Sequence, residues 1–341
     1  MRLDLAPYLD AIEYSMQRAV PPGGPPYDGL YGMLRYHLGW QDEAGLAGSQ
    51  RRGKRIRPLL CLLSCEAVGG AWQGALPAAT AVELIHNFTL IHDDIEDDSP
   101  TRHGRRTLWT VWGLAQGINA GDCLWALARG SMYGLQALGH LPEVVLESAR
   151  LLDRACLRLC EGQYLDISSE GDTGLVQDAY MSLIRGKTAA LVSAALTIGC
   201  VLGGSDSSTV AAASDFGEAM GLAFQITDDL LGIWGDPAIT GKSAASDLLS
   251  HKMTFPVIHA LSWERERGQR TLHELYSRPP DVDSKALMLS VLERSGAKEA
   301  TEQRAASFRH DMDRAWNSMN LQGIAAEALY ELAQSIIGRQ S

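Results

Sequence analysis

The chain lacks the cysteine spacings that build metal sites. Its six cysteines form no CxxC pair, and most lie in apolar segments with helical spacing, namely Cys61, Cys65, Cys156, Cys160 and Cys200. Cysteines in such segments are typical of buried, reduced thiols. The cysteine pattern therefore favours a cytoplasmic protein.

The sequence also has no excess of positive charge, and no secretory leader is expected. The net charge of −11 makes nucleic acid an unlikely general partner, since such partners need a basic surface. The first sixteen residues carry acids where a signal peptide would be apolar. One uncharged run, residues 188–205, nearly reaches membrane-spanning length, but its small and hydroxyl residues favour a buried core helix. No transmembrane segment is expected.

Strand alternation, an exact repeat and a clear interdomain linker are absent as well. The 341 residues are 46% hydrophobic, which is enough to bury a large core. Helical periodicity recurs along the chain, for example over residues 5–20, 29–40 and 58–68. These patterns predict an all-α protein in which residues 1–341 form a single helical bundle around a central cavity.

Acidic side chains are concentrated in one short stretch. Asp93, Asp94, Glu96, Asp97 and Asp98 follow an apolar segment that Pro77 opens. In a helix, residues three or four positions apart share a face, so Asp93 and Asp97 point the same way. Two carboxylates one turn apart suit Mg²⁺, above all when the ion also holds substrate phosphates. Taken alone, the motif is equally consistent with a solvated helix end.

A second acidic pair changes that balance. Asp228 and Asp229 lie in LAFQITDDLLGIWGD, again after an apolar helical segment. Two such sites facing each other across a bundle would clamp one polyanion through several metal ions. A basic cluster within residues 48–58 also favours an anion site over a solvated loop, because it directly precedes a helix with buried character.

Together these motifs resemble those of the trans-isoprenyl diphosphate synthases, the polyprenyl synthetase family. That family has DDxxD followed by RRG, and later FQxxDDxxD with a downstream GK. Further matching landmarks are GKRIRP (53–58), GQYLD (162–166), GKT (186–188) and GDPAITGK (235–242). The resemblance covers about residues 50–260 and keeps the family order. It implies an isoprenoid-synthase fold, a homodimer and a trans-prenyltransferase using Mg²⁺, with three ions per active site.

The reaction implied by the resemblance ionises an allylic diphosphate to a carbocation and pyrophosphate. Metals and cationic side chains must stabilise the charge that the leaving group develops. Asp93, Asp97 and Asp228 are the expected metal ligands, and the adjoining Asp94 and Asp229 are counted with the catalytic residues.

The resemblance also assigns the diphosphate-binding residues. Arg102, Lys187 and Lys242 would bind the allylic diphosphate. The Thr188 hydroxyl and the Gln225 amide would direct negative dipole ends at the cation, unless they serve only in helix packing.

Isopentenyl diphosphate would bind without metal. By resemblance it is held by Lys54, Arg57 and His86. His86 lies seven residues before Asp93, two turns down the same face, although a lone histidine there is also consistent with a core residue. The double bond of isopentenyl diphosphate attacks the cation and the released pyrophosphate takes the final proton. No protein nucleophile is expected.

The chain departs from the family pattern at three positions. The second arginine of RRG is His103, and a neutral imidazole is a weaker diphosphate ligand than a guanidinium. Where the family motif continues with a proline, this chain has Arg106, which would restore positive charge near His103. The second motif ends in Gly232 where the pattern has aspartate, which weakens that site.

Two alternatives on the same fold remain. A terpene cyclase would ionise a diphosphate without binding isopentenyl diphosphate, but the Ser and Glu of its usual metal motif are missing after Asp228. A non-catalytic partner subunit is disfavoured by the intact acids and lysines.

Product length depends on the apolar wall beside the first motif. Phe88 lies five residues before Asp93, a little over one turn toward the expected cavity floor. By resemblance, an aromatic residue there stops chain growth, which favours geranylgeranyl diphosphate (C20) over farnesyl diphosphate (C15). The alternative is that Phe88 is ordinary core.

Overall fold

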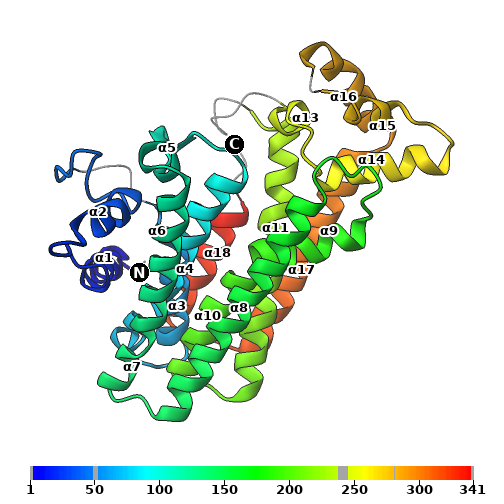
Figure 1. Ribbon diagram of the computed structural model, residues 1–341. Helices are drawn as coiled ribbons and strands as arrows, with labels where there is room; N and C mark the ends of the chain where they lie inside the picture. Colours follow the sequence, from blue (N-terminus) through cyan, green and yellow to red (C-terminus); the bar gives the residue numbers. More distant parts are fainter. Residues whose placement is uncertain (1–2, 49–52, 237–244, 280, 339–341) are drawn as a thin grey trace. The chain divides into compact units, whose positions relative to one another are not determined.

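The structure is a computed structural model that describes residues 3–48, 53–236, 245–279 and 281–338 (Figure 1). Within these residues helices dominate, and the regular sheet consists of one two-stranded hairpin. The predicted all-α class is confirmed. By its internal contacts the chain divides into two compact units, residues 1–154, 194–210 and 321–329, and residues 155–193, 211–320 and 330–341. The single-domain organisation stays a prediction.

The first unit contains the N-terminal helices and the first acidic motif. Its elements are α1 (Ala6–Ala19), α2 (Asp28–His37), α3 (Ile56–Ala67), η1 (Trp72–Ala75), α4 (Leu76–Glu96), β1 (Thr101–Arg102), β2 (Arg105–Arg106), α5 (Leu108–Trp112), α6 (Leu114–Met132) and α7 (Gly134–Ala137). Four longer helices have residues in both units, namely α8 (Pro142–Ser168), α10 (Ala190–Leu202), α11 (Ser207–Trp234) and α18 (Ile324–Ile337).

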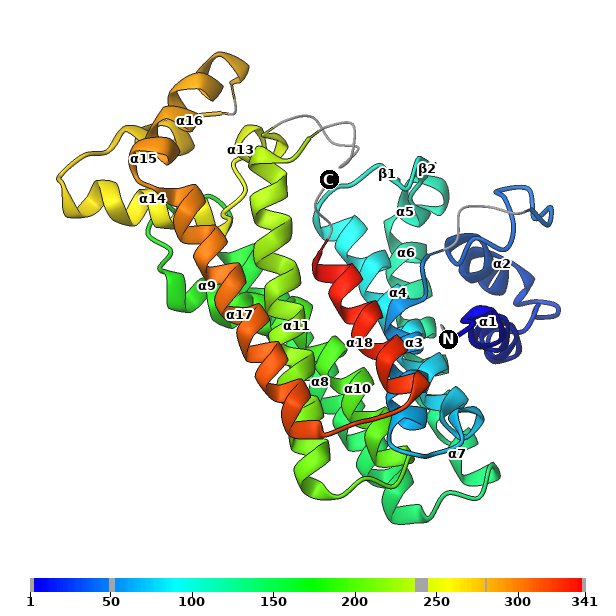
Figure 2. The same ribbon diagram turned by 180° about the vertical axis from the view of Figure 1, so that it is seen from behind.

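Helix α4 is the central helix of the first unit. Pro77 lies in its first turn, where a missing N–H costs no hydrogen bond. Residues 78–85 are buried on every side, so α4 is a core helix without a solvated face. It packs against α6, α3 and α1 (Figures 1 and 2). Its last turn reaches solvent, because Glu96, Asp97 and Asp98 are exposed.

A short hairpin follows α4. Thr101 pairs with Arg106 and Arg102 pairs with Arg105, in antiparallel register. The two-residue turn is His103 and Gly104, with φ of 53° and 78°, as a tight hairpin turn requires. Strands of two residues are too short to show alternation, which is why the sequence predicts no strand here.

The second unit contains the second acidic motif. Besides its shares of the longer helices, it has α9 (Gln177–Ile184), η2 (Arg185–Ala189), α13 (Ser246–Leu249), α14 (Phe255–Glu266), α15 (Thr271–Tyr276), η3 (Val282–Ser284), α16 (Lys285–Arg294) and α17 (Ala297–Met319). Helix α14 packs against α9, α15, α16 and α17. Phe216 of α11 meets Trp316 of α17 with ring centroids 5.3 Å apart.

One described helical stretch, Gln177–Leu202, is long and apolar enough to cross a membrane by length and composition alone. Since 67% of its most apolar window is buried inside the protein, it fits the predicted core helix.

The predicted burial of the cysteines is wrong for two of them. Cys160 is exposed and Cys156 is half-buried, because these positions of α8 turn away from the core.

Candidate functional site

The aspartates at the end of α4 differ in how deeply they are buried. Asp94 is 2% exposed and accepts a hydrogen bond from Arg102 Nε at 2.8 Å. Burial raises the pKa of Asp94, while the neighbouring Arg102 charge lowers it. Asp93 is half-buried and Asp97 is exposed. Asp94 therefore fixes Arg102 beside the motif, and Asp93 and Asp97 are the more open carboxylates.

The hairpin that carries Arg102 and His103 is fastened to α2. Arg105 Nη2 donates to Tyr36 O at 2.9 Å, and its guanidinium lies 4.0 Å from the centre of the Tyr36 ring. Tyr36 in turn donates through its hydroxyl to Arg106 O at 2.8 Å. The Arg106 side chain is exposed and pairs with Glu43 at 3.5 Å. Its predicted compensation for His103 stays a prediction.

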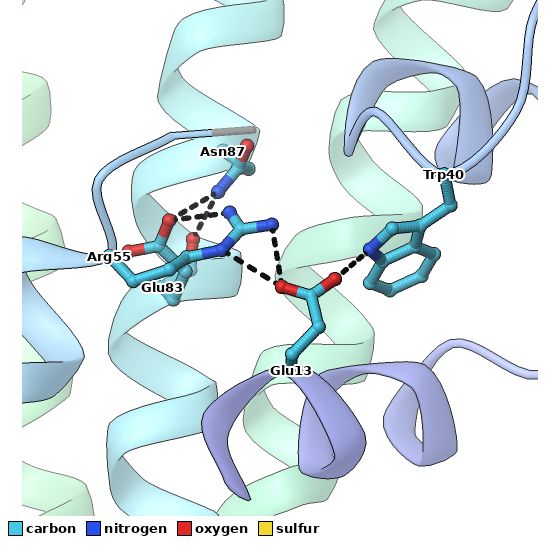
Figure 3. A network of polar contacts seen from close by, with 5 residues as sticks. All are labelled: Glu13, Trp40, Arg55, Glu83 and Asn87. Atoms are coloured by element: carbon cyan, nitrogen blue, oxygen red, sulfur yellow. Dashed lines mark hydrogen bonds and ion pairs between the residues drawn. The ribbon is translucent and has the colours of Figure 1, made fainter. Parts of the chain in front are cut away.

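The basic segment before α3 contains arginines in different environments. Arg55 is 6% exposed and pairs with Glu83 at 2.9 Å and Glu13 at 3.4 Å (Figure 3). Asn87 donates to Glu83 at 3.2 Å, and Trp40 Nε1 donates to Glu13. Figure 3 shows these side chains closing a network around the Arg55 guanidinium. The Arg55 charge is therefore neutralised by protein carboxylates. The sequence does not show that Arg55 differs in this way from the other basic residues of the segment.

Arg57 and His86 come together as predicted, with His37 beside them. Arg57 Nε and His37 Nε2 are buried and have no hydrogen-bond partner among the described residues. Burial, then the charges of Arg57 and Arg102, lowers the pKa of His86 well below its ordinary value. Burial, then Arg102, lowers the pKa of His37 to about 3. Buried donors without partners are rare in folded proteins, so this group is suited to an anionic acceptor. Lys54 is exposed just before α3.

His37 was not predicted from the sequence. It lies at the end of α2, outside every motif, and only the fold brings it near the chain's basic residues.

In the second unit Asp229 is the centre of a buried network. It is 1% exposed and accepts hydrogen bonds from the Tyr180 hydroxyl, from Phe255 N at 3.1 Å and from Gln225 Nε2 at 3.1 Å. Burial raises its pKa to about 6, although these hydrogen bonds act in the opposite direction. Asp228 is half-buried and lies about 100° further round α11. Asp229 therefore has a structural role, because it accepts hydrogen bonds from three other residues. Asp228 is the more open carboxylate.

The GKT landmark lies on η2, a π-helical turn that joins α9 to α10. Such turns recur at functional sites because they change the direction of side chains within a helix. A Cβ atom on Gly186 would lie 2.4 Å from Arg158 O, and one on Gly162 would lie 2.3 Å from Lys187 N. Only glycine allows the backbones of η2 and α8 to approach this closely.

The close approach of η2 to α8 brings polar side chains of the two segments together. Lys187 Nζ meets Asp166 Oδ2 at 2.5 Å. The Thr188 hydroxyl donates to Gln225 Oε1 at 2.8 Å, so the two residues are bonded to each other. Their role at a cation stays a prediction. Lys242 lies outside the described residues.

The donor chemistry fits Mg²⁺, although the parts of the chain that the structure describes hold no group of three or more His, Cys, Asp or Glu placed as a metal cluster. Asp93 and Asp97 belong to the first unit, and Asp228 belongs to the second. All three offer carboxylate oxygens, the ligands that this hard cation takes in proteins.

Phe88 of α4 is half-buried and meets the His92 ring edge to face, with centroids 4.9 Å apart. The neighbouring Thr89 donates to His86 O at 2.9 Å. The predicted role of Phe88 in product length stays a prediction.

The helical fold is that of solved isoprenyl synthases. A polyprenyl synthetase from Streptomyces coelicolor A3(2) matches with a TM-score of 0.86 and 34% identity over 96% of each chain. A geranylgeranyl pyrophosphate synthase from Corynebacterium glutamicum, solved with isoprenyl diphosphate and magnesium, matches with a TM-score of 0.82 and 26% identity. That match covers 99% of this chain and 100% of the other. The predicted isoprenoid-synthase fold is confirmed.

The family follows from the sequence comparisons. The polyprenyl synthetase model matches residues 40–292. A geranylgeranyl diphosphate synthase of Mycobacterium tuberculosis is 43% identical over 249 residues, 72% of this chain and 69% of that protein. A (2E,6E)-farnesyl diphosphate synthase of Mycobacterium bovis is 35% identical over 316 residues, 91% of this chain and 86% of that protein. The chain belongs to the polyprenyl synthetase family and is a trans-prenyltransferase. This favours the predicted synthase over the two alternatives, a terpene cyclase and a non-catalytic partner subunit.

Proposed function

We propose that the chain joins isopentenyl diphosphate to an allylic diphosphate in an Mg²⁺-dependent reaction and makes geranylgeranyl diphosphate. The observation that carries this proposal is the pairing, within the first unit, of open Asp93 and Asp97 carboxylates with a buried cationic group that has unpartnered donors. The 43% identical geranylgeranyl diphosphate synthase supports the C20 product. Farnesyl diphosphate is the second candidate, supported by the 35% identical relative.

In this proposal the allylic diphosphate is bound by acids through metal and by basic side chains directly. Asp93, Asp97 and Asp228 would supply carboxylate ligands for Mg²⁺, with three ions expected per active site. Bound Mg²⁺ supplies positive charge that neutralises the pyrophosphate as the C–O bond breaks.

The basic residues that bind the same diphosphate are Arg102, Lys187 and Lys242. Asp94 and Asp166 orient Arg102 and Lys187 through the ion pairs described above. A side chain oriented in advance loses less entropy when it binds, so it stabilises the developing charge more effectively.

Isopentenyl diphosphate is bound in this proposal by Lys54, Arg57, His86 and His103. The neutral His86 imidazole donates a hydrogen bond without placing a further charge among the arginines. The double bond attacks the carbocation, and a proton passes from the new carbon chain to the released pyrophosphate. Thr188 and Gln225 turn their oxygen dipoles toward the positive carbon.

We propose that the protein acts in the cytoplasm as a homodimer. Helix α6 exposes Leu114, Ile118 and Trp125, which are 55%, 44% and 44% exposed. At spacings of four and seven residues they lie on one face of the helix, an apolar stripe suited to a second copy.

The proposed activity is tested with purified protein, Mg²⁺, farnesyl diphosphate and isopentenyl diphosphate. Chromatography of the dephosphorylated products should show a C20 alcohol, and none with Asp93→Asn under the same conditions. Accumulation of C15 from a C10 starter without C20 favours the second candidate. Absence of any condensation refutes the proposed reaction.

A further inference from the structure

A pocket of about 420 Å³ lies between the loop before α9 (residues 169–176) and the turn that joins α14 to α15. Figures 1 and 2 show this loop beside α14, and all the lining residues belong to the second unit. The volume is within the range of small-molecule sites in proteins. The charged and polar lining includes Thr173, Glu264, Arg265, Arg270 and His273. None of the lining residues belongs to the acidic motifs or to the proposed substrate-binding residues.

Glu264 gives this pocket a buried carboxylate. The residue is 1% exposed, and its Oε2 accepts a hydrogen bond from Leu272 N at 2.8 Å. Its Oε1 is also buried and has no hydrogen-bond partner among the residues that the structure describes. Buried polar atoms without partners are rare, and a buried carboxylate is stabilised best by a cationic donor. Glu264 Oε1 is therefore suited to the ammonium group of a ligand in the pocket.

Arg265 and Arg270 bring positive charge to the same pocket, and both side chains are exposed. Arg265 Nη2 donates to Thr173 O at 3.3 Å, which joins the last turn of α14 to the loop before α9. Guanidinium groups bind phosphate through several N–H donors at once. Two positive charges and the one negative charge of Glu264 leave these three side chains with a formal net charge of +1.

The hydrogen bonds of His273 add a further donor. Arg270 Nη2 lies within hydrogen-bond distance of His273 Nε2, and a guanidinium can only donate. His273 Nε2 therefore accepts, so the ring proton is on Nδ1, which donates to the Thr173 hydroxyl oxygen at 2.6 Å. The proton of the Thr173 hydroxyl is then directed to an acceptor other than His273. A ligand anion in the pocket would be such an acceptor.

We propose that this pocket is a second binding site, which takes a small phosphate monoester that carries an ammonium group. The phosphate accepts hydrogen bonds from Arg265, Arg270 and the Thr173 hydroxyl, and the ammonium group donates to Glu264 Oε1. A phosphate monoester carries about −1.5 to −2 charges at pH 7, so the ammonium group brings the ligand close to −1. This charge complements the formal +1 of the pocket. The inference goes beyond the proposed prenyl transfer and does not depend on it.

The first test is isothermal titration calorimetry of the full chain in EDTA, which removes the divalent cations that the proposed active site uses. The probes are 2-aminoethyl phosphate and 3-aminopropyl phosphate, and their matched controls are ethyl phosphate and propyl phosphate. At least one amino compound should bind about tenfold or more tightly than its control, as a hydrogen bond between charged groups allows. Equal affinities within both pairs overturn the recognition of an ammonium group.

The second test assigns the binding to this pocket. Glu264→Gln keeps the shape of the side chain and removes its charge, so the preference for the amino compounds should disappear. Binding of the alkyl phosphates should stay unchanged, which also shows that this variant is folded. A preference that survives Glu264→Gln overturns the role of this carboxylate.

Arg270→Met tests the phosphate contacts without disturbing a buried residue. It should weaken binding of amino and alkyl phosphates about tenfold or more. Arg267→Met is the matched control, because Arg267 is an exposed neighbour that donates to Trp263 O and does not line the pocket. Probe binding that is unaffected by Arg270→Met, or weakened equally by Arg267→Met, overturns the site.

A lipid headgroup could offer related chemistry, since phosphatidylethanolamine also carries phosphate and ammonium groups. Its phosphate is a diester with less negative charge, so the pocket should favour the free monoester. Co-sedimentation with vesicles of phosphatidylethanolamine and phosphatidylcholine should therefore show no binding. Binding to these vesicles that Arg270→Met abolishes, with no binding of the soluble probes, overturns the free monoester as the ligand.

Discussion

Substitution of Arg55 tests which residues of the basic segment before α3 stabilise the fold and which bind substrate. Arg55→Met removes the guanidinium between Glu13 and Glu83 but keeps a side chain of similar length (Figure 3). The Glu83 side chain is only 5% exposed, and among the described residues Asn87 would remain as the hydrogen-bond donor to its carboxylate. Removing one partner of a buried ion pair costs about 3–5 kcal/mol, because the other charge stays buried. The free energy of unfolding should fall by this amount.

The assay is urea unfolding followed by circular dichroism at 222 nm. Lys54→Met is the matched control, since Lys54 is exposed next to Arg55 in the same segment. Its free energy of unfolding should stay within about 0.5 kcal/mol of wild type, as for most surface substitutions. Its KM for isopentenyl diphosphate should rise, because Lys54 is proposed to bind that substrate.

A double variant distinguishes a lost charge from lost packing. Arg55→Met/Glu83→Met removes both charges and should recover part of the stability lost in Arg55→Met. A loss below about 1 kcal/mol in Arg55→Met, or no recovery in the double variant, would refute the view that Arg55 and Glu83 stabilise each other as a buried pair.

Four further outcomes are expected. Asp93→Ala and Asp228→Ala should each lower kcat by roughly 10² or more in steady-state assays, as loss of electrostatic stabilisation does, and near-normal turnover in either would rule out the proposed metal role. His103→Arg should lower the KM for isopentenyl diphosphate and leave the allylic KM nearly unchanged, since a guanidinium binds phosphate more strongly than an imidazole; an unchanged KM would mean that another group fills the role. Phe88→Ala should lengthen the product by about one isoprene unit if the ring is the floor of the tunnel, and an unaltered chain length on chromatography would contradict this. His37 keeps its ring neutral in the folded protein because its pKa is lowered to about 3, whereas the unfolded chain takes up a proton below about pH 6.5. The stability of the folded protein should therefore fall as pH drops from 6 to 4, and His37→Asn should reduce that slope by up to about 1.4 kcal/mol per pH unit in urea titrations; an unaltered slope would place the titration elsewhere.

Several helices could be predicted from periodicity because their burial is regular. Residues 5–20 were expected to be helical, and α1 occupies Ala6–Ala19 with Tyr8, Ile12 and Met16 buried at the expected spacing. The hairpin at residues 101–106 and the π-helical turn η2 were missed. Both are set by local backbone geometry over a few residues, which leaves no periodic signal in the side chains.

The sequence by itself determined which chemical groups this protein has and in what order. Helical periodicity predicted the all-α class, and the family order of the acidic motifs, the glycine landmarks and the lysines predicted the prenyltransferase. These features are properties of residue type and spacing, so they survive without coordinates.

Only the tertiary structure decided which of several like residues is buried and paired. Asp94 and Asp229 are enclosed by hydrogen bonds, whereas their neighbours Asp93 and Asp228 are more open. Likewise Asp247 reaches the space left at Gly232 from a helix that begins fourteen residues later along the chain. Burial and pairing depend on contacts between segments far apart in sequence, and the spacing of residues within one segment does not contain them.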